Sequence, residues 1–177
     1  DILLIEPVIH NDERGYFVET YKQKLLDEAL GYQVNFIQDN ESKSTSKGVL
    51  RGLHFQSPPF TQNKLVRVIQ GEVLDIAVDI RRNSPTFGKH ISVELSQKNK
   101  KQLFVPIGFA HGFIVLSEEA IFAYKVDAYY SAEHEVGIAY DDKDINIDWH
   151  FLDEEIILSK ADQNYPNLAD IKNYFDF

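Results

Sequence analysis

The chain has 177 residues, of which 44% are hydrophobic and 26% charged, so it can form one domain, residues 1–177, with a sizeable core. Its net charge of −10 argues against a nucleic-acid or anionic-membrane surface, because either would need a basic patch. It has no cysteine and no apolar run long enough to span a membrane, and its N-terminal stretch "ILLIEPVI" lacks the pattern of a signal peptide, so we expect none there. We therefore expect a cytoplasmic protein without disulfides.

In chain order, the first predicted element is a helix over residues 21–30, "YKQKLLDEAL", which ends at Gly31. The stretch "GVLRGLHFQ", residues 48–56, is typical of a buried strand, and "KLVRVIQGEVLDIAVDI", residues 64–80, predicts two strands around Gly71. Further strand patterns follow at 89–95, 102–116 and 120–130. A second helix is expected near the C-terminus, over 167–175.

Many short strands with Gly and Pro between them predict a mainly β fold. We expect an antiparallel double-sheet jelly roll, a cupin-like barrel with two or three short helices. Two packed antiparallel sheets leave a concave mouth at one end, and small barrels often bind a ligand there.

Two histidines are the first candidates for chemistry. His111 lies in "PIGFAHGF", a predicted Pro-x-Gly-x-x-His turn that is similar to the second motif of cupins, where such a histidine often binds metal. The first cupin motif needs His-x-His and a glutamate, but this chain has His54-Phe55-Gln56 followed by Ser57. Two histidines fall short of the three or four ligands that a metal site needs, so no metal is expected. The plain alternative for His54 is a hydrogen-bonded core histidine.

Arg51 and His54 both lie on the strand predicted at 48–56. Their odd separation would place them on opposite faces of an ideal strand. A bulge at Gly52 would bring both side chains to one cleft, and glycine favours such bulges.

Several longer motifs then occur in a fixed order: "DERGYFVETY", "FIQDNESKS", "GVLRGLHFQ", "NKLVRVIQGEVLDIAVDIRRNSPTFG", "VPIGFAHGF", "YKVDAYY" and "LSKAD". With them the chain resembles the dTDP-4-dehydrorhamnose 3,5-epimerases over nearly its whole length, from about Glu6 to about Pro166. The resemblance implies a jelly roll without metal or organic cofactor. It also implies a homodimer whose active sites are completed across the interface. The implied reaction inverts C3 and C5 of dTDP-4-dehydro-6-deoxy-D-glucose in dTDP-L-rhamnose biosynthesis.

The resemblance also assigns roles to residues. His54 resembles the catalytic base, Asp162 its carboxylate partner, Tyr124 the proton donor and Lys64 the residue near the sugar C4 oxygen. The residues that resemble the family's nucleotide and sugar contacts are Arg14, Glu19, Gln38, Asp39, Asn40, Arg51, His111, Tyr130 and Glu135. The chain departs from the family at one position. The family commonly has lysine directly before the aspartate, whereas here Ala161 stands there and the lysine is Lys160.

Four other functions remain open on the sequence. A binding protein on the same fold would lack the acid or the base, and a metal-dependent cupin would hold a stoichiometric metal. A related epimerase of a nucleotide 4-keto-6-deoxy sugar would invert only C3 or only C5, and ketoisomerases share the fold.

Overall fold

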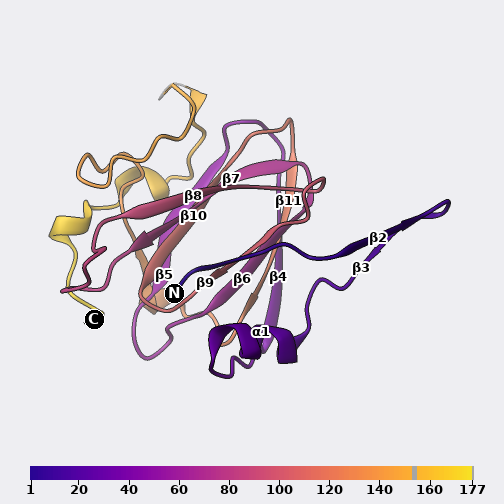
Figure 1. Ribbon diagram of the computed structural model, residues 1–177. Helices are drawn as coiled ribbons and strands as arrows, with labels where there is room; N and C mark the ends of the chain where they lie inside the picture. The colour runs from indigo at the N-terminus through magenta and orange to yellow at the C-terminus, as the bar shows by residue number, and fades with distance from the viewer. Residues whose placement is uncertain (153–154, 177) are drawn as a thin grey trace.

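The computed structural model describes residues 1–152 and 155–176 and has two antiparallel five-stranded sheets that face each other (Figure 1). The first sheet has the order β1-β9-β6-β11-β4, with strands Leu3–Ile5, Gln102–Val105, Lys64–Gln70, Ala120–Val126 and Gln38–Ser44. The second has the order β12-β5-β10-β7-β8, with strands Glu135–Gly137, Leu50–Gln56, Phe109–Val115, Glu72–Asp79 and His90–Ser96. The expected mainly β, antiparallel double-sheet fold is confirmed.

A hydrophobic core fills the space between the two sheets. Each strand buries alternate side chains there, because successive side chains of a strand point to opposite faces. The first sheet contributes Val66, Val68 and Phe122, and the second contributes Val73 and Phe113, all of them at most 5% exposed. Any cavity between the two sheets is therefore lined by other residues on the inward faces of these strands.

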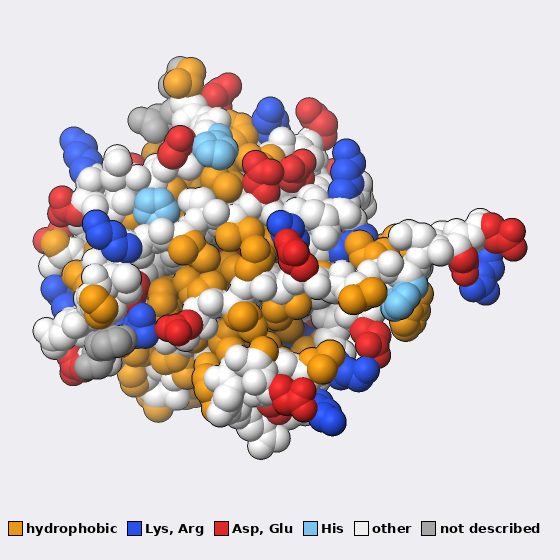
Figure 2. Space-filling model, viewed as in Figure 1, with side chains coloured by type: hydrophobic (Ala, Val, Ile, Leu, Met, Phe, Trp, Pro, Cys, Tyr) orange, Lys and Arg blue, Asp and Glu red, His pale blue; other side chains and the backbone are white. Residues whose placement is uncertain are grey.

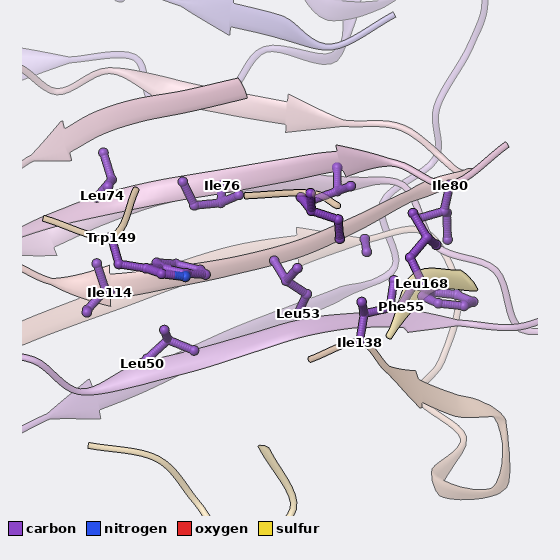
Figure 3. Close-up of a cluster of buried hydrophobic side chains, with 13 residues drawn as sticks. Leu50, Leu53, Phe55, Leu74, Ile76, Ile80, Ile114, Ile138, Trp149 and Leu168 are labelled. Atoms are coloured by element: carbon purple, nitrogen blue, oxygen red, sulfur yellow. The ribbon is translucent and has the colours of Figure 1, made fainter. Parts of the chain in front are cut away.

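The C-terminal quarter of the chain covers the outer face of the second sheet. Figure 3 shows Trp149, Ile138 and Leu168 packed against strand residues such as Leu53 and Ile76. This packing carries the last segment of the chain back to β5, with a short 3-10 turn, η3 (Asp162–Asn164), in contact with that strand. The C-terminal segment can thus contribute side chains to the same site as β5.

Helix α1 (Gln23–Leu30) packs on the outer face of the first sheet through Leu26, which contacts Leu65 and Phe104. It ends as expected at Gly31, which adopts the left-handed conformation (φ 78°) and donates its N–H to the Asp27 carbonyl. The predicted helix at this position is confirmed, two residues shorter at its start.

The prediction of a helix over residues 167–175 is wrong. Only a 3-10 turn, η4 (Leu168–Asp170), forms there. The backbone N–H of Leu168 bonds to the Asp142 carboxylate, and the Phe175 carbonyl accepts from Arg82, so tertiary partners replace helical hydrogen bonds. A further 3-10 turn, η1, spans Ala132–His134, and no described helix is long and apolar enough to cross a membrane.

Strands β2 (Ile9–Asp12) and β3 (Gly15–Val18) form a hairpin that projects from the body of the molecule (Figure 1). Val8, Tyr16 and Phe17 on this arm are more than half exposed. In the space-filling view, hydrophobic side chains lie where the arm leaves the body and charged ones gather at its tip (Figure 2). The arm buries little of its own apolar surface within one copy of the chain.

Candidate active site

A cavity of about 290 Å³ opens between the two sheets. Seven of the residues singled out from the sequence line it, namely Arg51, His54, Lys64, His111, Tyr124, Glu135 and Asp162. They come from β5, β6, β10, β11, β12 and the turn η3, so the fold gathers side chains that are more than 100 residues apart in the sequence. The cavity is the candidate active site.

His54 and Asp162 form a close pair in this cavity. Nε2 of His54 lies 2.7 Å from Oδ1 of Asp162, and the Ser159 hydroxyl donates to Oδ2 of the same carboxylate at 2.7 Å. Burial raises the pKa of Asp162, but the hydrogen bonds from His54, Ser159 and the Gly52 backbone outweigh it, and the net pKa lies below the usual value. The ionised carboxylate therefore accepts the Nε2 proton, which leaves Nδ1 of His54 as the basic nitrogen.

The His54 side chain is 28% exposed, and it lines the cavity. The alternative of a core histidine closed off from solvent does not describe this position. An imidazole that is open to a cavity and held by a carboxylate behind it has the arrangement of a general base.

Arg51 and His54 lie on the same face of β5, as the bulge hypothesis requires. His54 is opposite His111 and Arg51 is opposite Phe113, so Gly52 and Leu53 together face the single residue Gly112. Gly52 has φ 121°, and a Cβ added there would lie 2.6 Å from the Gly112 Cα. Only glycine fits this conformation and this close approach. The bulge at Gly52 is confirmed.

Lys64 and Tyr124 reach the cavity from the first sheet. Burial lowers the pKa of Lys64 to about 8, although Glu135 and Asp75 partly offset it. Burial, and next the charge of Glu135, raise the pKa of Tyr124, with Arg51 acting in the opposite sense. Near neutral pH, Lys64 is mostly cationic and Tyr124 carries its proton.

His111 belongs to a second pair that sequence reasoning missed. Its Nε2 lies 2.9 and 3.0 Å from the two carboxylate oxygens of Asp75, which is fully buried. Burial raises the pKa of Asp75, and His111 and Lys64 partly offset the effect. The only sequence signal was a carboxylate among the apolar residues of β7. The expected turn forms at residues 107–108, between β9 and β10, but the placement of His111 in that turn is wrong, because His111 lies within β10.

Three more predicted contacts lie beside the cavity. Gln38 and Asn40 share a face of β4 with Ser42, which lines the cavity, and the Gln38 amide donates to Asn40 at 2.7 Å. Tyr130 hydrogen-bonds Glu135, and its pKa is raised by partial burial and by this carboxylate.

The remaining predicted contacts do not reach the cavity. Arg14 is 85% exposed at the tip of the β2–β3 arm, where it pairs with Asp12. Glu19 pairs with Lys22 beside α1, and Asp39 pairs with Lys125 on the outer face of the first sheet. Within a single copy of the chain, these three residues are separate from His54.

Lys160 and Ala161, where the sequence differs from the motif expected by resemblance, lie differently relative to the cavity. Ala161 lines the cavity, whereas Lys160 is exposed and outside the lining. Lys160 uses its backbone carbonyl to accept from Asn164. The cavity therefore has a methyl group at position 161, where the resemblance implied a lysine.

Among residues 1–152 and 155–176, no group of three or more His, Cys, Asp or Glu side chains is placed to hold a metal ion. What the cavity does contain is a carboxylate-held imidazole, a partly buried ammonium and a protonated phenol. These groups suit removal and return of a proton next to a carbonyl, with the ammonium stabilising the enolate oxygen.

Comparison with known proteins agrees with this chemistry. A family model described as dTDP-4-dehydrorhamnose 3,5-epimerase matches residues 1–170. A relative of that name from Shigella flexneri is 54% identical over 175 residues, covering 99% of this chain and 94% of the relative.

Solved structures of both 3,5-epimerases and a monoepimerase are similar to this chain. A Legionella pneumophila dTDP-6-deoxy-D-glucose-3,5-epimerase in complex with dTDP-4-keto-L-rhamnose is 49% identical, with a TM-score of 0.94 over 99% of this chain and 93% of that one. A 3'-monoepimerase from Streptomyces bikiniensis in complex with dTDP-quinovose is 31% identical, with a TM-score of 0.88 over 95% and 84%. Since the family model and a majority-identical relative both span nearly the whole sequence, this chain belongs to the dTDP-4-dehydrorhamnose 3,5-epimerase family.

Proposed function

We propose that this chain inverts C3 and C5 of dTDP-4-dehydro-6-deoxy-D-glucose to give dTDP-4-dehydro-L-rhamnose, a step of dTDP-L-rhamnose biosynthesis. The observation that carries the assignment is the His54–Asp162 pair at 2.7 Å, facing Lys64 and Tyr124 across one cavity. The ligand of the Legionella relative is a dTDP-linked 4-keto sugar, which supports a substrate of that class.

The chemistry needs these groups because C3 and C5 both flank the C4 ketone. Nδ1 of His54 takes the proton from carbon, and the electron pair of the broken C–H bond moves to the C4 oxygen as an enolate. The ammonium of Lys64 stabilises that oxyanion. Tyr124 then gives its phenolic proton to the opposite face of the same carbon, and solvent restores both side chains to their starting protonation.

The other cavity residues bind the nucleotide sugar in this proposal. Arg51 contacts the diphosphate, because its planar guanidinium can donate hydrogen bonds in pairs. His111 and Glu135 contact the sugar side, Tyr130 stacks in the nucleotide site, and Gln38 and Asn40 extend the contacts along β4. The chain itself supplies all of the acid, base and oxyanion groups, so the reaction needs no cofactor.

The test is solvent deuterium incorporation. Wild-type protein in D₂O should place deuterium at both C3 and C5 of the product, read by NMR. Label at one centre only would assign a single-centre epimerase instead, and no label would refute the function. His54→Ala should abolish incorporation, with a loss of about 10² to 10⁴ in rate or more, because the imidazole held by Asp162 is the base assigned to proton removal. Retained dTDP binding shows that the variant is folded.

A homodimer with sites completed across the interface is part of the proposal. The projecting arm leaves Arg14 exposed and away from the cavity, together with the apolar side chains of Val8, Tyr16 and Phe17. A second copy would cover these apolar side chains and give Arg14 an anionic partner. Such exposed apolar patches mark association surfaces. Sedimentation of the pure protein should give twice the chain mass, and a monomer would contradict this proposal.

The absence of a metal requirement and the cytoplasmic location remain predictions. Metal analysis of pure, active protein should find less than stoichiometric metal, and chelation should leave turnover unchanged. A stoichiometric metal lost together with activity would favour the metal-dependent cupin. Cell fractionation should recover the protein with the cytoplasmic fraction.

A further inference from the structure

Tyr165 lines the cavity but has no role in the sequence analysis above. It comes three residues after Asp162, directly after turn η3, so one short piece of chain delivers both side chains to His54. The rings of Tyr165 and His54 have centroids 5.5 Å apart and planes at 84°, the edge-to-face arrangement that aromatic pairs prefer.

Gly137 explains how the Tyr165 ring reaches this place. Gly137 lies directly opposite His54 in the pairing of β12 with β5. A Cβ built on Gly137 would lie 2.3–2.4 Å from three carbons of the Tyr165 ring, so the ring occupies the space of the missing side chain. Backbone on one side and imidazole on the other leave the ring little freedom.

Resting on the function proposed above, we propose that Tyr165 is a positioning residue for that reaction. Its ring holds the His54 imidazole in the orientation that keeps Nε2 on Asp162 and Nδ1 toward the sugar. It also shields the hydrogen bond between them from water. Gly137 is the permissive partner, because any larger residue would displace the ring.

The ring, rather than the hydroxyl, carries this role. Burial, followed by the charges of Glu135, Asp162 and Tyr130, raises the pKa of Tyr165 to about 12, so the phenol stays protonated and is no base near neutral pH. Tyr165→Phe should therefore keep kcat within about threefold of wild type, whereas Tyr165→Ala should lower kcat about ten- to a hundredfold, the cost of a misplaced catalytic group. KM should change little in either variant, since the ring is not assigned to substrate binding.

Gly137→Ala gives an independent measurement of the same contact. Its backbone is not in the left-handed region, so alanine is compatible with the strand, and the three atoms nearest to the added methyl are all carbons of the Tyr165 ring. We expect Gly137→Ala to lower kcat in wild type and to have no further effect in Tyr165→Ala, because the ring it displaces is then absent.

Tyr174→Ala is the matched control. Tyr174 makes a similar edge contact, centroids 5.5 Å apart, with Phe55, the neighbour of His54 on β5, but lies outside the cavity. Its loss should lower the melting temperature and leave kcat unchanged. The melting temperature and dTDP affinity of every variant separate misfolding from a loss of positioning.

A second readout does not depend on turnover. The Nε2 proton shared by His54 and Asp162 should give a downfield NMR signal in wild type and Tyr165→Phe, and exchange broadening should remove it in Tyr165→Ala. The inference is overturned if Tyr165→Ala keeps kcat within twofold and retains the signal. It is also overturned if Tyr165→Phe lowers kcat as much as Tyr165→Ala does. The same holds if Gly137→Ala lowers kcat by the same factor in the Tyr165→Ala background as in wild type. A wild type without turnover would refute the proposed function, whereas the NMR signal would still report whether the ring protects the pair.

Discussion

Arg51 and His54 are three residues apart on β5 and nevertheless line one cavity, because two residues of that strand lie opposite the single residue Gly112. The bulge sets the guanidinium that is assigned to the diphosphate beside the base that is assigned to the sugar. One strand can therefore present both groups to a single nucleotide sugar in the proposed reaction.

Arg51→Ala should raise the substrate dissociation constant about tenfold to a hundredfold, since a charge-assisted hydrogen bond contributes about 1.5–3 kcal/mol. Arg51→Lys should recover only part of this, because an ammonium cannot donate as a fork. Calorimetric titration with dTDP measures both. Lys43→Ala is the control, because Lys43 pairs with Glu119, which directly precedes the neighbouring strand β11, and neither residue lines the cavity. Equal affinity for wild type and Arg51→Ala would remove Arg51 from the diphosphate site.

Tyr124→Phe should separate proton removal from inversion. Removal needs only His54 and the oxyanion contact of Lys64, so deuterium exchange into unreacted substrate should persist. Return of a proton on the opposite face needs the phenol, so net inversion should fall about 10² to 10⁴. Time-resolved NMR in D₂O follows both quantities in one sample. A parallel fall of exchange and inversion would show that Tyr124 orients the sugar rather than protonating it.

The lowered pKa of Lys64 leads us to expect that activity falls at alkaline pH. Its pKa of about 8 lies below the usual value for lysine, so raising the pH through 8 removes the charge that stabilises the enolate. The kcat/KM profile, which reports the free enzyme, should therefore fall above about pH 8. In Lys64→Arg the guanidinium stays charged, and whatever activity remains should be flat to at least about pH 10. A wild-type profile that is level through pH 9 would contradict the role of Lys64.

Arg14 allows a test of the two-subunit site. If the arm serves the neighbouring copy, mixing inactive His54→Ala protein with Arg14→Ala protein forms heterodimers with one doubly defective site and one intact site. Activity should then rise above the sum of the separate proteins once subunits exchange. Lys24→Ala, which removes a comparably exposed cation on α1, should be active alone and give no such gain. No recovery after proven exchange would place Arg14 at its own chain's site or at none.

The strand pattern of the fold could be predicted because it is local. Alternation along 64–80 and the glycine between its two strands depend only on nearby residues, and both strands form as expected. The prediction of a C-terminal helix was wrong because it too used only local residues. Leu168 is held by Asp142 and packs on the second sheet, and long-range partners of this kind leave no periodic signal.

Some residues of the candidate site could be predicted from the sequence and others could not. His54 and Asp162 could be assigned through the family motifs that contain them, and their 2.7 Å contact agrees with that assignment. Asp75 and Tyr165 could not, since a single polar residue in a buried strand, or an aromatic three positions after a carboxylate, has many uses. Their importance depends on β10 and β12 lying beside β5, which is a property of the folded sheet.

The return of the C-terminal segment to β5 has a consequence for synthesis of the chain. Among the described residues, the twelve strands are complete by Gly137, so both sheets can pair while later residues are still being added. His54 is already part of that barrel, but Ser159, Asp162 and Tyr165 are synthesised after it. A nascent barrel therefore holds an imidazole without its carboxylate partner, and competence for the reaction comes only when the segment that carries Asp162 docks.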